Sequence, residues 1–301
     1  MSKNGFQKTL ELPVLLAGIG LHTGKPVHMV FKPAAINAGI HFRRTDLPGK
    51  PTIAALYSNV KDTRLSTLIG DDQGNTISTI EHVMAALYAL GITNAVIEVD
   101  APEIPIMDGS SIPFIKALEN NVITQDAPYH VLRILKEVKV GDGDVYAVIK
   151  PSEKFSIHFD IDFPAVAIGK QSFDFDASTN DCVQDLLSAR TFCLNHEIDY
   201  MRSKGLALGG TLENAIVVDG EKILNPEGLR YTDEFVRHKI LDVVGDLFTS
   251  GFHVIGAFQG HKSSHALNNK LLRAVFADKS NFETIPVDAL DVQEISRKAV
   301  A

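Results

Sequence analysis

Cysteine is scarce in this chain of 301 residues, which contains only Cys182 and Cys193. Two cysteines are too few for a disulfide framework or a cysteine-based zinc site, which fits a reducing compartment. Basic residues are also in deficit, with 29 Lys and Arg against 37 Asp and Glu, for a net charge of −8. This balance argues against non-specific nucleic-acid binding, so an anionic substrate needs a local cluster of Lys or Arg.

Long apolar runs are missing as well. The most apolar early run, residues 12–21, is broken by Pro13 and two glycines and is too short to span a bilayer. The first six residues lack the apolar core of a signal peptide. We therefore expect a cytoplasmic protein without a transmembrane segment, although a peripheral membrane contact stays open. The composition, 45% hydrophobic and 22% charged, is typical of a globular protein.

In each half of the chain, strand patterns are followed by helix patterns. In the first half, Ser78-Thr-Ile-Glu81 has the form of a capping box, and the helix that it opens should stop at Gly91. Apolar or small residues surround this helix, so it should be buried with His82 pointing inward. The turn-rich segment near 126–129 separates a first domain, 1–128, from a second, 129–301. The other expected strands are 27–31, 40–43, 95–99, 131–140, 145–150, 156–163, 215–219 and 252–258, the other helices are 113–120, 235–248 and 265–276, and about the last twenty residues should form a weakly packed tail.

The segment 235–248 has an unusual polar face for a helix. His238, Asp242, Gly245 and Asp246 fall on that face, opposite a stripe of apolar residues. A solvated face usually mixes Lys, Glu, Gln and Ser, whereas this one carries an imidazole and two carboxylates a turn apart, with a glycine that opens space beside them. His and Asp at i and i+4 lie close enough to share one ion. Surface pairs of this kind are common, however, so the pair alone is a weak metal signal.

His82, His238 and Asp242 together form a plausible ligand set. Two imidazoles and a carboxylate leave a fourth position open, as a catalytic zinc requires. A lone histidine on an apolar helix is more often a core residue that bonds a backbone carbonyl, so this reading of His82 remains open. A non-haem Fe(II) oxygenase uses the same two-histidine, one-carboxylate set and is the rival class.

Further ionisable residues suggest acid and base catalysis. Glu81 lies next to His82 and could act as a general base, or it could only complete the capping box with Ser78. A cationic imidazole is disfavoured at a helix N-terminus, so His265 would need a carboxylate partner, and Asp246 could supply it. Otherwise both are ordinary exposed residues. Lys239 and Lys262 are the nearest cations in sequence, and together these groups suit metal-assisted hydrolysis of an anionic substrate.

Several long motifs resemble the zinc-dependent UDP-3-O-acyl-N-acetylglucosamine deacetylases of lipid A biosynthesis, which Gram-negative bacteria carry out. The motifs extend from residue 20 to about 276. They are Gly20-Leu-His-Thr-Gly24, Ser78-Thr-Ile-Glu-His82, Ala101-Pro-Glu-Ile-Pro-Ile-Met-Asp-Gly-Ser110, Ala189-Arg-Thr-Phe192, Leu208-Gly-Gly210, Asp233-Glu-Phe-Val-Arg-His-Lys239, Gly245-Asp-Leu247 and His265-Ala-Leu-Asn-Asn-Lys270.

The resemblance implies two α+β domains packed with their helices between the sheets and the metal at the interface. Each domain should carry an insertion, and the second, about 193–222, should form a passage for the acyl chain of the substrate. The residues expected to line this passage or the adjacent substrate site are Phe192, Leu194, Ile198, Met201, Leu206, Gly210, Ala215 and Val217. Core packing is the alternative role for the apolar ones.

The resemblance also assigns chemical roles. His82, His238 and Asp242 would bind Zn2+, with Fe2+ as an alternative in the cell, and Glu81 would deprotonate the attacking water. Thr191 and Lys239 would help stabilise the oxyanion, and His265, held protonated by Asp246, would protonate the leaving amine. Phe163, Asp162 and Lys262 would hold the nucleotide end of a UDP-acylated amino sugar. A monomer is expected. The chain departs from the family pattern at Val145, Cys193, Leu194 and Asn195.

Overall fold

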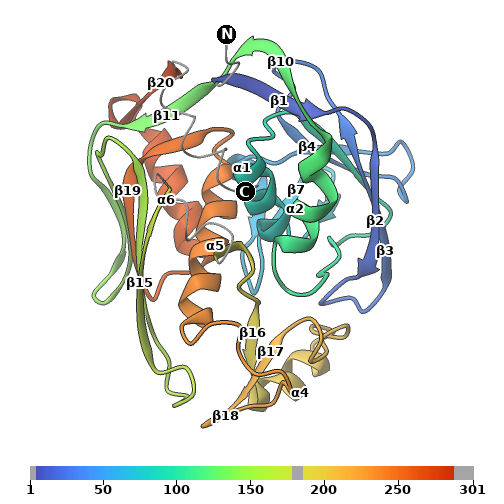
Figure 1. Ribbon diagram of the computed structural model, residues 1–301, viewed down its shortest axis with the longest axis vertical. Coiled ribbons are helices and arrows are strands. Elements are labelled where there is room, and N and C mark those ends of the chain that lie inside the picture. Colours follow the sequence, from blue (N-terminus) through green and yellow to red (C-terminus); the bar gives the residue numbers. More distant parts are fainter. Residues whose placement is uncertain (1–4, 178–185, 288–301) are drawn as a thin grey trace.

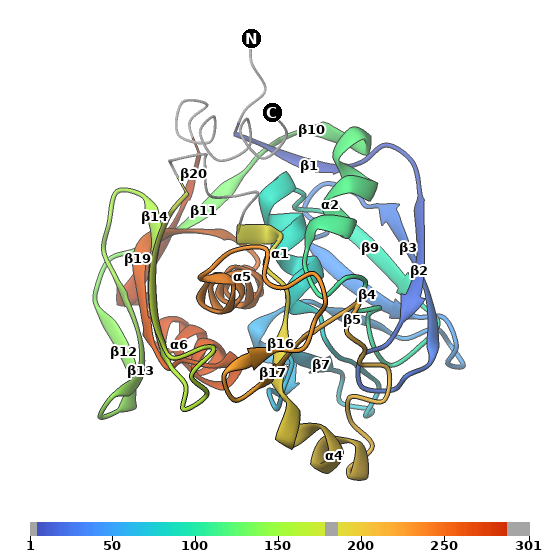
Figure 2. The ribbon, with the colours of Figure 1, turned by 60° about the horizontal axis from the view of Figure 1, so that its bottom comes forward.

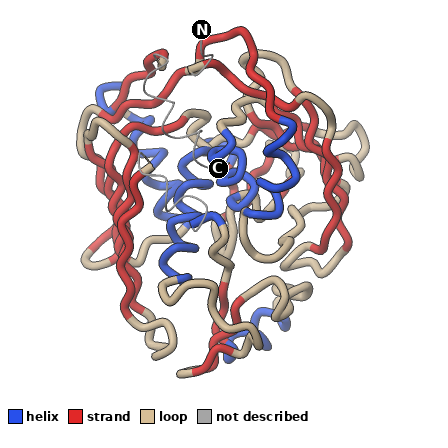
Figure 3. Tube along the Cα trace, viewed as in Figure 1, coloured by secondary structure: helices blue, strands red, loops and turns tan. Residues whose placement is uncertain are grey.

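The computed structural model describes residues 5–177 and 186–287. Two large sheets, one from each half of the chain, form the outer layers, and helices fill the space between them (Figures 1 and 3). The predicted α+β class, with helices between sheets, is thus confirmed. No helix in the described part of the chain is long and apolar enough to cross a membrane.

The sheet of the first half has the strand order β2-β3-β9-β4-β5. Its neighbours are antiparallel except β4 and β9, which run parallel. Alternation predicted β3 and β4, and β9 was also expected as a strand; in β3 and β9 every second side chain faces the core. The strands are β2 (Val14–Ile19), β3 (Pro26–Pro33), β4 (Ile40–Arg44), β5 (Thr52–Ala54) and β9 (Ala95–Val99).

The sheet of the second half is built around the long strand β19 (His253–His261), which pairs with β11, β13 and β14. The prediction of one strand over 131–140 was wrong, because the chain forms two strands, β11 and β12, with an exposed break at Leu135–Glu137. The remaining strands are β11 (His130–Ile134), β12 (Val138–Asp142), β13 (Val145–Lys150), β14 (Phe155–Asp162), β15 (Lys170–Asp176) and β20 (Phe282–Pro286).

The expected C-terminal tail is also partly wrong. Strand β20 pairs antiparallel with β11 over its whole length, so residues 282–286 belong to the sheet. Its backbone hydrogen bonds to β11 and the packing of Phe282 and Ile285 hold the strand in place. The rest of the expected tail, 288–301, lies outside the described residues.

Two small sheets and a pair of strands complete the fold. Strands β6-β7-β8 form one small sheet, and β16-β17-β18 with helix α4 form another that lies beyond the ends of the large sheets (Figures 1 and 2). The division at 128/129 remains a prediction. The bounds are β1 (Phe6–Leu10), β10 (Val122–Pro128), β6 (Val60–Asp62), β7 (Leu68–Gly70), β8 (Thr76–Ile77), β16 (Phe192–Leu194), β17 (Ile216–Asp219), β18 (Lys222–Ile223) and α4 (Asn195–Ser203).

Helices α1 (Glu81–Leu90) and α5 (Glu234–Phe248) form the centre of the molecule. In Figure 2, α5 is seen end-on between β14 and β19 on one side and α1 on the other. Every residue of α1 is buried, as expected, and Gly91 ends the helix in the left-handed conformation. The other helices are α2 (Ile112–Leu118), α6 (His265–Ala277) and the short 3-10 turns at Tyr57–Asn59, Glu119–Asn121 and Lys279–Asn281.

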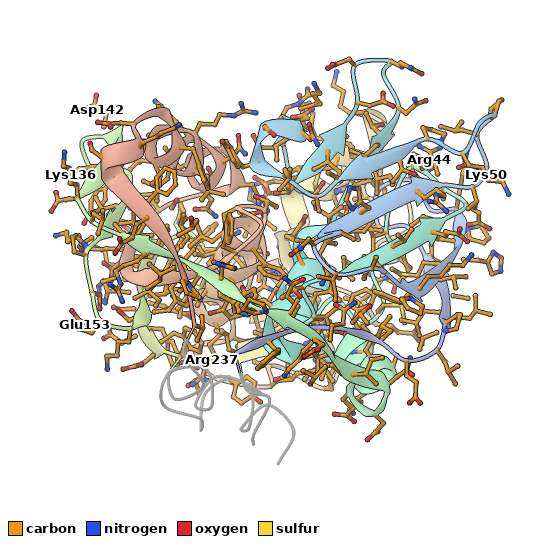
Figure 4. The ribbon with its side chains drawn as sticks, turned by 90° about the horizontal axis from the view of Figure 1, so that it is seen from above. Arg44, Lys50, Lys136, Asp142, Glu153 and Arg237 are labelled. Atoms are coloured by element: carbon orange, nitrogen blue, oxygen red, sulfur yellow. The ribbon has the colours of Figure 1, made fainter. Side chains whose placement is uncertain are left out.

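The polar face of α5 is not exposed to solvent. Almost all of the helix is buried, including His238, Asp242 and Asp246. The amphipathic pattern therefore marks a polar cluster inside the protein and not the boundary with solvent. Charged side chains such as Lys50, Lys136 and Glu153 lie instead at the outer edges of the two halves (Figure 4).

The predicted capping box at the start of α1 does not form. No side chain caps this helix, and Ser78 Oγ donates to the carbonyl of Pro102 over 3.3 Å. Thr79 has a φ of 62°, which turns the chain just before the helix. Glu81 is therefore the first residue of α1, whereas a capping box with Ser78 as N-cap would require it to be the third. Its carboxylate is therefore available for another purpose.

Candidate active site

Three potential metal ligands meet where α1 crosses α5. Asp242 Oδ1 lies 3.7 Å from His82 Nε2 and 3.5 Å from His238 Nε2. One donor atom from each of these residues lies within 4.8 Å of the others, and all three side chains are buried. The structure thus brings together the ligand set that the sequence suggested, although His82 and His238 are 156 positions apart in the chain.

Gly245 allows this close approach of the two helices. A Cβ atom at this position would lie 2.0 Å from the carbonyl oxygen of Glu81, far inside contact distance. Any side chain would therefore push the first turn of α1 away from α5. The sequence pattern suggested that Gly245 opens space on this face of the helix. The structure shows that the backbone of Glu81 occupies that space.

The ring of His238 is fixed by a backbone carbonyl. Its Nδ1 donates to the oxygen of Ala189 over 3.0 Å. Because a carbonyl only accepts, Nδ1 carries the proton and Nε2 keeps its lone pair, directed toward Asp242. Burial lowers the pKa of His238 to about 3, so the imidazole is neutral near pH 7. A neutral imidazole with a free lone pair is the form that binds a metal.

Asp242 has one oxygen with a hydrogen-bond donor and one without. Lys239 Nζ donates to Oδ2 over 2.7 Å, whereas no described residue donates a hydrogen bond to the buried Oδ1. Burial raises the pKa of Asp242, but the ammonium of Lys239 and the neighbouring imidazoles together outweigh it and hold the pKa well below its usual value. An ionised carboxylate oxygen without a donor, beside two imidazole nitrogens, is the environment that a divalent cation fits.

Glu81 lies beside this cluster, with its carboxylate held by the backbone. The amide N–H of Thr67 donates to Glu81 Oε2 over 2.9 Å. The side chain is only 3% exposed, and burial raises its pKa above the ordinary value of a glutamate. A carboxylate with a raised pKa is suited to accept a proton and pass it on near neutral pH.

His265 and Asp246 form the expected pair on the other side of the cluster. His265 Nδ1 donates to Asp246 Oδ2 over 2.8 Å, and His265 Nε2 lies 4.0 Å from Asp242 Oδ2. Burial lowers the pKa of His265, but the carboxylates of Asp246 and Asp242 outweigh it and raise the pKa to about 9. The imidazole is therefore protonated at pH 7 and can serve as a proton donor.

Two residues that hold Asp246 were missed in the sequence. Thr67 Oγ1 donates to Asp246 Oδ1 over 2.6 Å, and Asn268 Nδ2 donates to Oδ2 over 2.8 Å. Asn268 lies one helical turn beyond His265 on α6, so its spacing offered a signal. Thr67 lies in an irregular stretch between β6 and β7, and nothing in the local sequence points to it.

The clustered residues open into a cavity of about 290 Å3. Glu81, His82, His238, Asp242 and His265 all line it. Its wall also includes the predicted substrate and oxyanion residues Phe163, Thr191, Phe192, Leu194 and Lys239. One chamber therefore brings together the residues that the sequence suggested as metal ligands, base and acid.

A second cavity, of about 510 Å3, lies within the second small sheet and α4. It shares Leu21, Leu65 and Thr191 with the first cavity, so the two are neighbours. Of the residues expected in an acyl passage, those that line it are Phe192, Ile198, Met201, Gly210, Ala215 and Val217. Leu206 lines instead a third cavity of about 770 Å3, between α4 and the stretch 62–68.

The residues expected at the nucleotide end lie where the parallel strands β14 and β19 end. Lys262 Nζ forms ion pairs with Asp162 Oδ2 at 3.1 Å and with Asp144 Oδ2 at 2.9 Å. The ring of Phe163 lines the 290 Å3 cavity and packs edge-on against Phe192, with 5.5 Å between ring centroids. Asp162 and Lys262 do not line that cavity.

Arg190 and Glu234 form a buried ion pair next to the site, which was not predicted from the sequence. Glu234, the first residue of α5, accepts from both the backbone N–H and the guanidinium Nε of Arg190, at 3.0 and 2.9 Å. Both side chains are almost fully buried. Arg190 lies between Ala189, whose carbonyl orients His238, and Thr191, which lines the cavity, so this pair sets the register of that segment against α5.

Comparison with known proteins gives a consistent result. A family model described as UDP-3-O-acyl N-acetylglycosamine deacetylase matches residues 7–277. A protein of Shewanella frigidimarina called UDP-3-O-acyl-N-acetylglucosamine deacetylase is 47% identical over 286 residues, which cover 94% of each chain. A protein of the same name from Actinobacillus succinogenes is 48% identical over 280 residues, 92% of each chain.

Proposed function

Because this chain belongs to the UDP-3-O-acyl N-acetylglycosamine deacetylase family, we propose that it is a hydrolase that removes the N-acetyl group of UDP-3-O-(3-hydroxyacyl)-N-acetylglucosamine, an early step of lipid A biosynthesis. The observation that carries the proposal is that one cavity is lined by the imidazoles of His82 and His238 with the carboxylate of Asp242, by Glu81, and by the protonated His265. Amide hydrolysis needs an electrophile, a base and an acid at one place.

We assign His82, His238 and Asp242 as ligands of one zinc ion, with Fe2+ as an alternative occupant in the cell. The unpartnered Asp242 Oδ1 and the lone pair of His238 Nε2 support this ligand set. When bound, the ion would act as a Lewis acid toward the amide carbonyl and would lower the pKa of water. Lys239 neutralises the second oxygen of Asp242 and lines the same cavity.

In this proposal Glu81 takes a proton from the water that attacks the acetamide carbonyl. Its buried carboxylate has a raised pKa, and the Thr67 N–H occupies only Oε2, so Oε1 is left to accept the proton. Removal of that proton lets the water oxygen form the new bond to the carbonyl carbon. The oxyanion that develops would accept a hydrogen bond from the hydroxyl of Thr191 and would be stabilised by the positive charge of Lys239; both residues line the cavity.

His265 acts as the general acid. As the C–N bond breaks, the departing nitrogen needs a proton, and His265 Nε2 faces the cavity while its Nδ1–H stays bonded to Asp246. The carboxylate of Asp246 stabilises the charged imidazole before the transfer. The products are acetate and the free 2-amino sugar nucleotide, so the added water is fully accounted for.

The neighbouring 510 Å3 cavity would accept the acyl chain of the substrate. Ile198, Met201, Ala215 and Val217 give part of its wall an apolar surface, and it shares Thr191 with the cavity of the proposed reacting centre. Phe163, Asp162 and Lys262 would hold the nucleotide end. We further propose a monomer that works in the cytoplasm without a nucleic-acid partner.

The main alternative is a non-haem Fe(II) oxygenase, because two histidines and one carboxylate are also its ligand set. A non-catalytic sugar-nucleotide-binding protein is the second alternative. The test is to incubate the purified protein with UDP-3-O-acyl-N-acetylglucosamine without oxygen and to measure acetate and the free amine. We expect equal amounts of both. No acetate without oxygen, or none under any condition, would contradict the proposal.

A further inference from the structure

Thr67 connects three parts of the site although it belongs to none of the predicted motifs. It lies just before β7, in the small sheet β6-β7-β8, and its side chain is only 3% exposed. The small sheet is an excursion of the chain between β5 and α1. Thr67 is therefore placed at the reacting centre by an element that contributes none of the proposed metal ligands.

All three hydrogen-bonding groups of Thr67 are used there. Its amide N–H donates to Glu81 Oε2 over 2.9 Å, and its hydroxyl donates to Asp246 Oδ1 over 2.6 Å. Its carbonyl accepts from the amide of Ile80, the residue before α1, over 3.4 Å. One residue is thus bonded to the base, to the backbone that carries the base, and to the partner of the acid.

The hydroxyl also determines how Asp246 can turn. His265 Nδ1 and Asn268 Nδ2 both donate to Oδ2, at 2.8 Å each, and Thr67 is the donor at Oδ1. Donors at both oxygens fix the plane of a buried carboxylate. Without the hydroxyl, Asp246 Oδ1 would lose this donor. The carboxylate could then rotate, which would weaken the alignment of the hydrogen bond between Oδ2 and His265 Nδ1.

We propose that Thr67 is a positioning residue that sets the distance and orientation between Glu81 and the Asp246–His265 pair. The inference rests on the proposed function, in which these groups are the base and the acid. Thr67 itself does not line the 290 Å3 cavity, so it acts through its neighbours and not on the substrate. Its role should appear in the rate of the chemical step and not in substrate binding.

Thr67→Val is the decisive variant, because valine has nearly the same shape, keeps the backbone N–H and lacks only the hydroxyl. In the zinc-loaded full chain we expect kcat to fall by about 10- to 100-fold, the usual range for a lost outer partner of an active-site group. KM and zinc affinity, measured by chelator competition, should not change. Thr67→Ser, which restores the hydroxyl, should recover most of kcat.

Thr9→Val is the matched control. Thr9 is a buried threonine on β1, 4% exposed, and it lines none of the three cavities described above. Its hydroxyl donates to the carbonyl of Asn94 over 2.7 Å and accepts from the amide of Ala34 over 3.0 Å. This change removes both hydrogen bonds and should lower the thermal midpoint at least as much as Thr67→Val does, while leaving kcat unchanged. A loss of kcat in both variants would indicate general destabilisation and would overturn the proposal.

The proton NMR signal of the His265 Nδ1–H supplies a readout that needs no substrate. A hydrogen bond to a carboxylate moves this signal downfield, and His265→Gln identifies it by its loss. We expect Thr67→Val to shift it upfield and Thr67→Ser and Thr9→Val to leave it in place. An unchanged signal, or wild-type kcat in Thr67→Val, would overturn the inference. If the wild type released no acetate, the proposed function would fail, and the NMR signal would still decide whether Thr67 orients the pair.

Discussion

Asp242 and Asp246 lie one turn apart on α5, are 3% and 4% exposed, and have opposite surroundings. Asp246 accepts hydrogen bonds at both oxygens, from Thr67, His265 and Asn268. Asp242 accepts from Lys239 at one oxygen, and no described donor reaches the other, which faces two imidazole nitrogens instead.

The difference shows what each carboxylate is built to stabilise. A buried carboxylate oxygen without a donor costs free energy unless a cation compensates it, so Asp242 is suited to a metal. A carboxylate with donors at both oxygens is already compensated, so Asp246 is suited to hold a charged imidazole. The same residue type, four positions apart, thus serves two kinds of chemistry.

Asp242→Asn should produce the largest effect. The amide removes the negative charge from the ligand set, so zinc affinity should fall by more than the roughly 10- to 100-fold typical of a lost outer partner, and activity should fall with it. Zinc content after dialysis and chelator competition measure the change. Full zinc occupancy in this variant would contradict the ligand assignment and would make the two aspartates equivalent.

Glu81→Ala should separate the base from the metal site. We expect kcat to fall by about two to four orders of magnitude, the range for a lost general base, while zinc content stays at the wild-type level. Acetate release and metal analysis on the same preparation are the measurements. Activity close to that of the wild type would contradict the role of Glu81.

Asp246→Asn should keep the metal and change the pH profile. The Asp246 carboxylate raises the pKa of His265, and burial alone lowers it, so the variant should lose protonated His265 at a lower pH than the wild type. Activity that needs the protonated acid declines on the alkaline side as pH rises through this pKa, which is about 9 without a metal and lower beside a bound cation.

The alkaline limb of kcat should therefore move to lower pH in Asp246→Asn, and kcat at neutral pH should fall by about 10- to 100-fold. A profile measured from pH 5 to 10 checks this shift. Loss of zinc from this variant, or an alkaline limb in the wild-type position, would show that Asp246 does not tune the acid.

Gly245→Ala changes none of the ligand side chains and tests the packing of α1 on α5 that supports both helices of the site. Replacing a glycine inside a helix by alanine usually stabilises a protein by about 0.5–1 kcal/mol. Here the added Cβ would overlap the Glu81 carbonyl, so we expect a loss of about 1–3 kcal/mol in the free energy of unfolding, the range for an overpacked core. Denaturant unfolding measures it, and a stabilised variant would contradict the close packing of α1 on α5.

Much of this site could be predicted because its ligands follow helical spacing. His238 and Asp242 are four residues apart, and α1 is apolar enough to require burial, which directs His82 inward. The prediction of a capping box was wrong because the sequence of these four residues does not indicate the positive φ of Thr79, which depends on the packing of the turn. The carboxylate of Glu81 is consequently held by Thr67 and not by the helix end.

Contacts between distant segments could not be predicted. Thr67 and Asp246 are 179 residues apart, and the carbonyl of Ala189 that orients His238 is a backbone group without a sequence signature. The exposed break at 135–137 and the pairing of β20 with β11 likewise depend on which strands become neighbours. Periodicity identifies elements and faces, whereas register between elements arises only when the core is packed.

Metal titration tests the central claim most directly. The protein is stripped with a chelator, zinc is returned in steps, and acetate release from UDP-3-O-acyl-N-acetylglucosamine is measured at each step for the wild type and for Asp242→Asn. The wild type should be inactive without metal and should reach full activity at one zinc per chain, while the variant should need far more zinc. Acetate release that is independent of metal, or equal titration curves for the two proteins, would contradict the assignment of His82, His238 and Asp242.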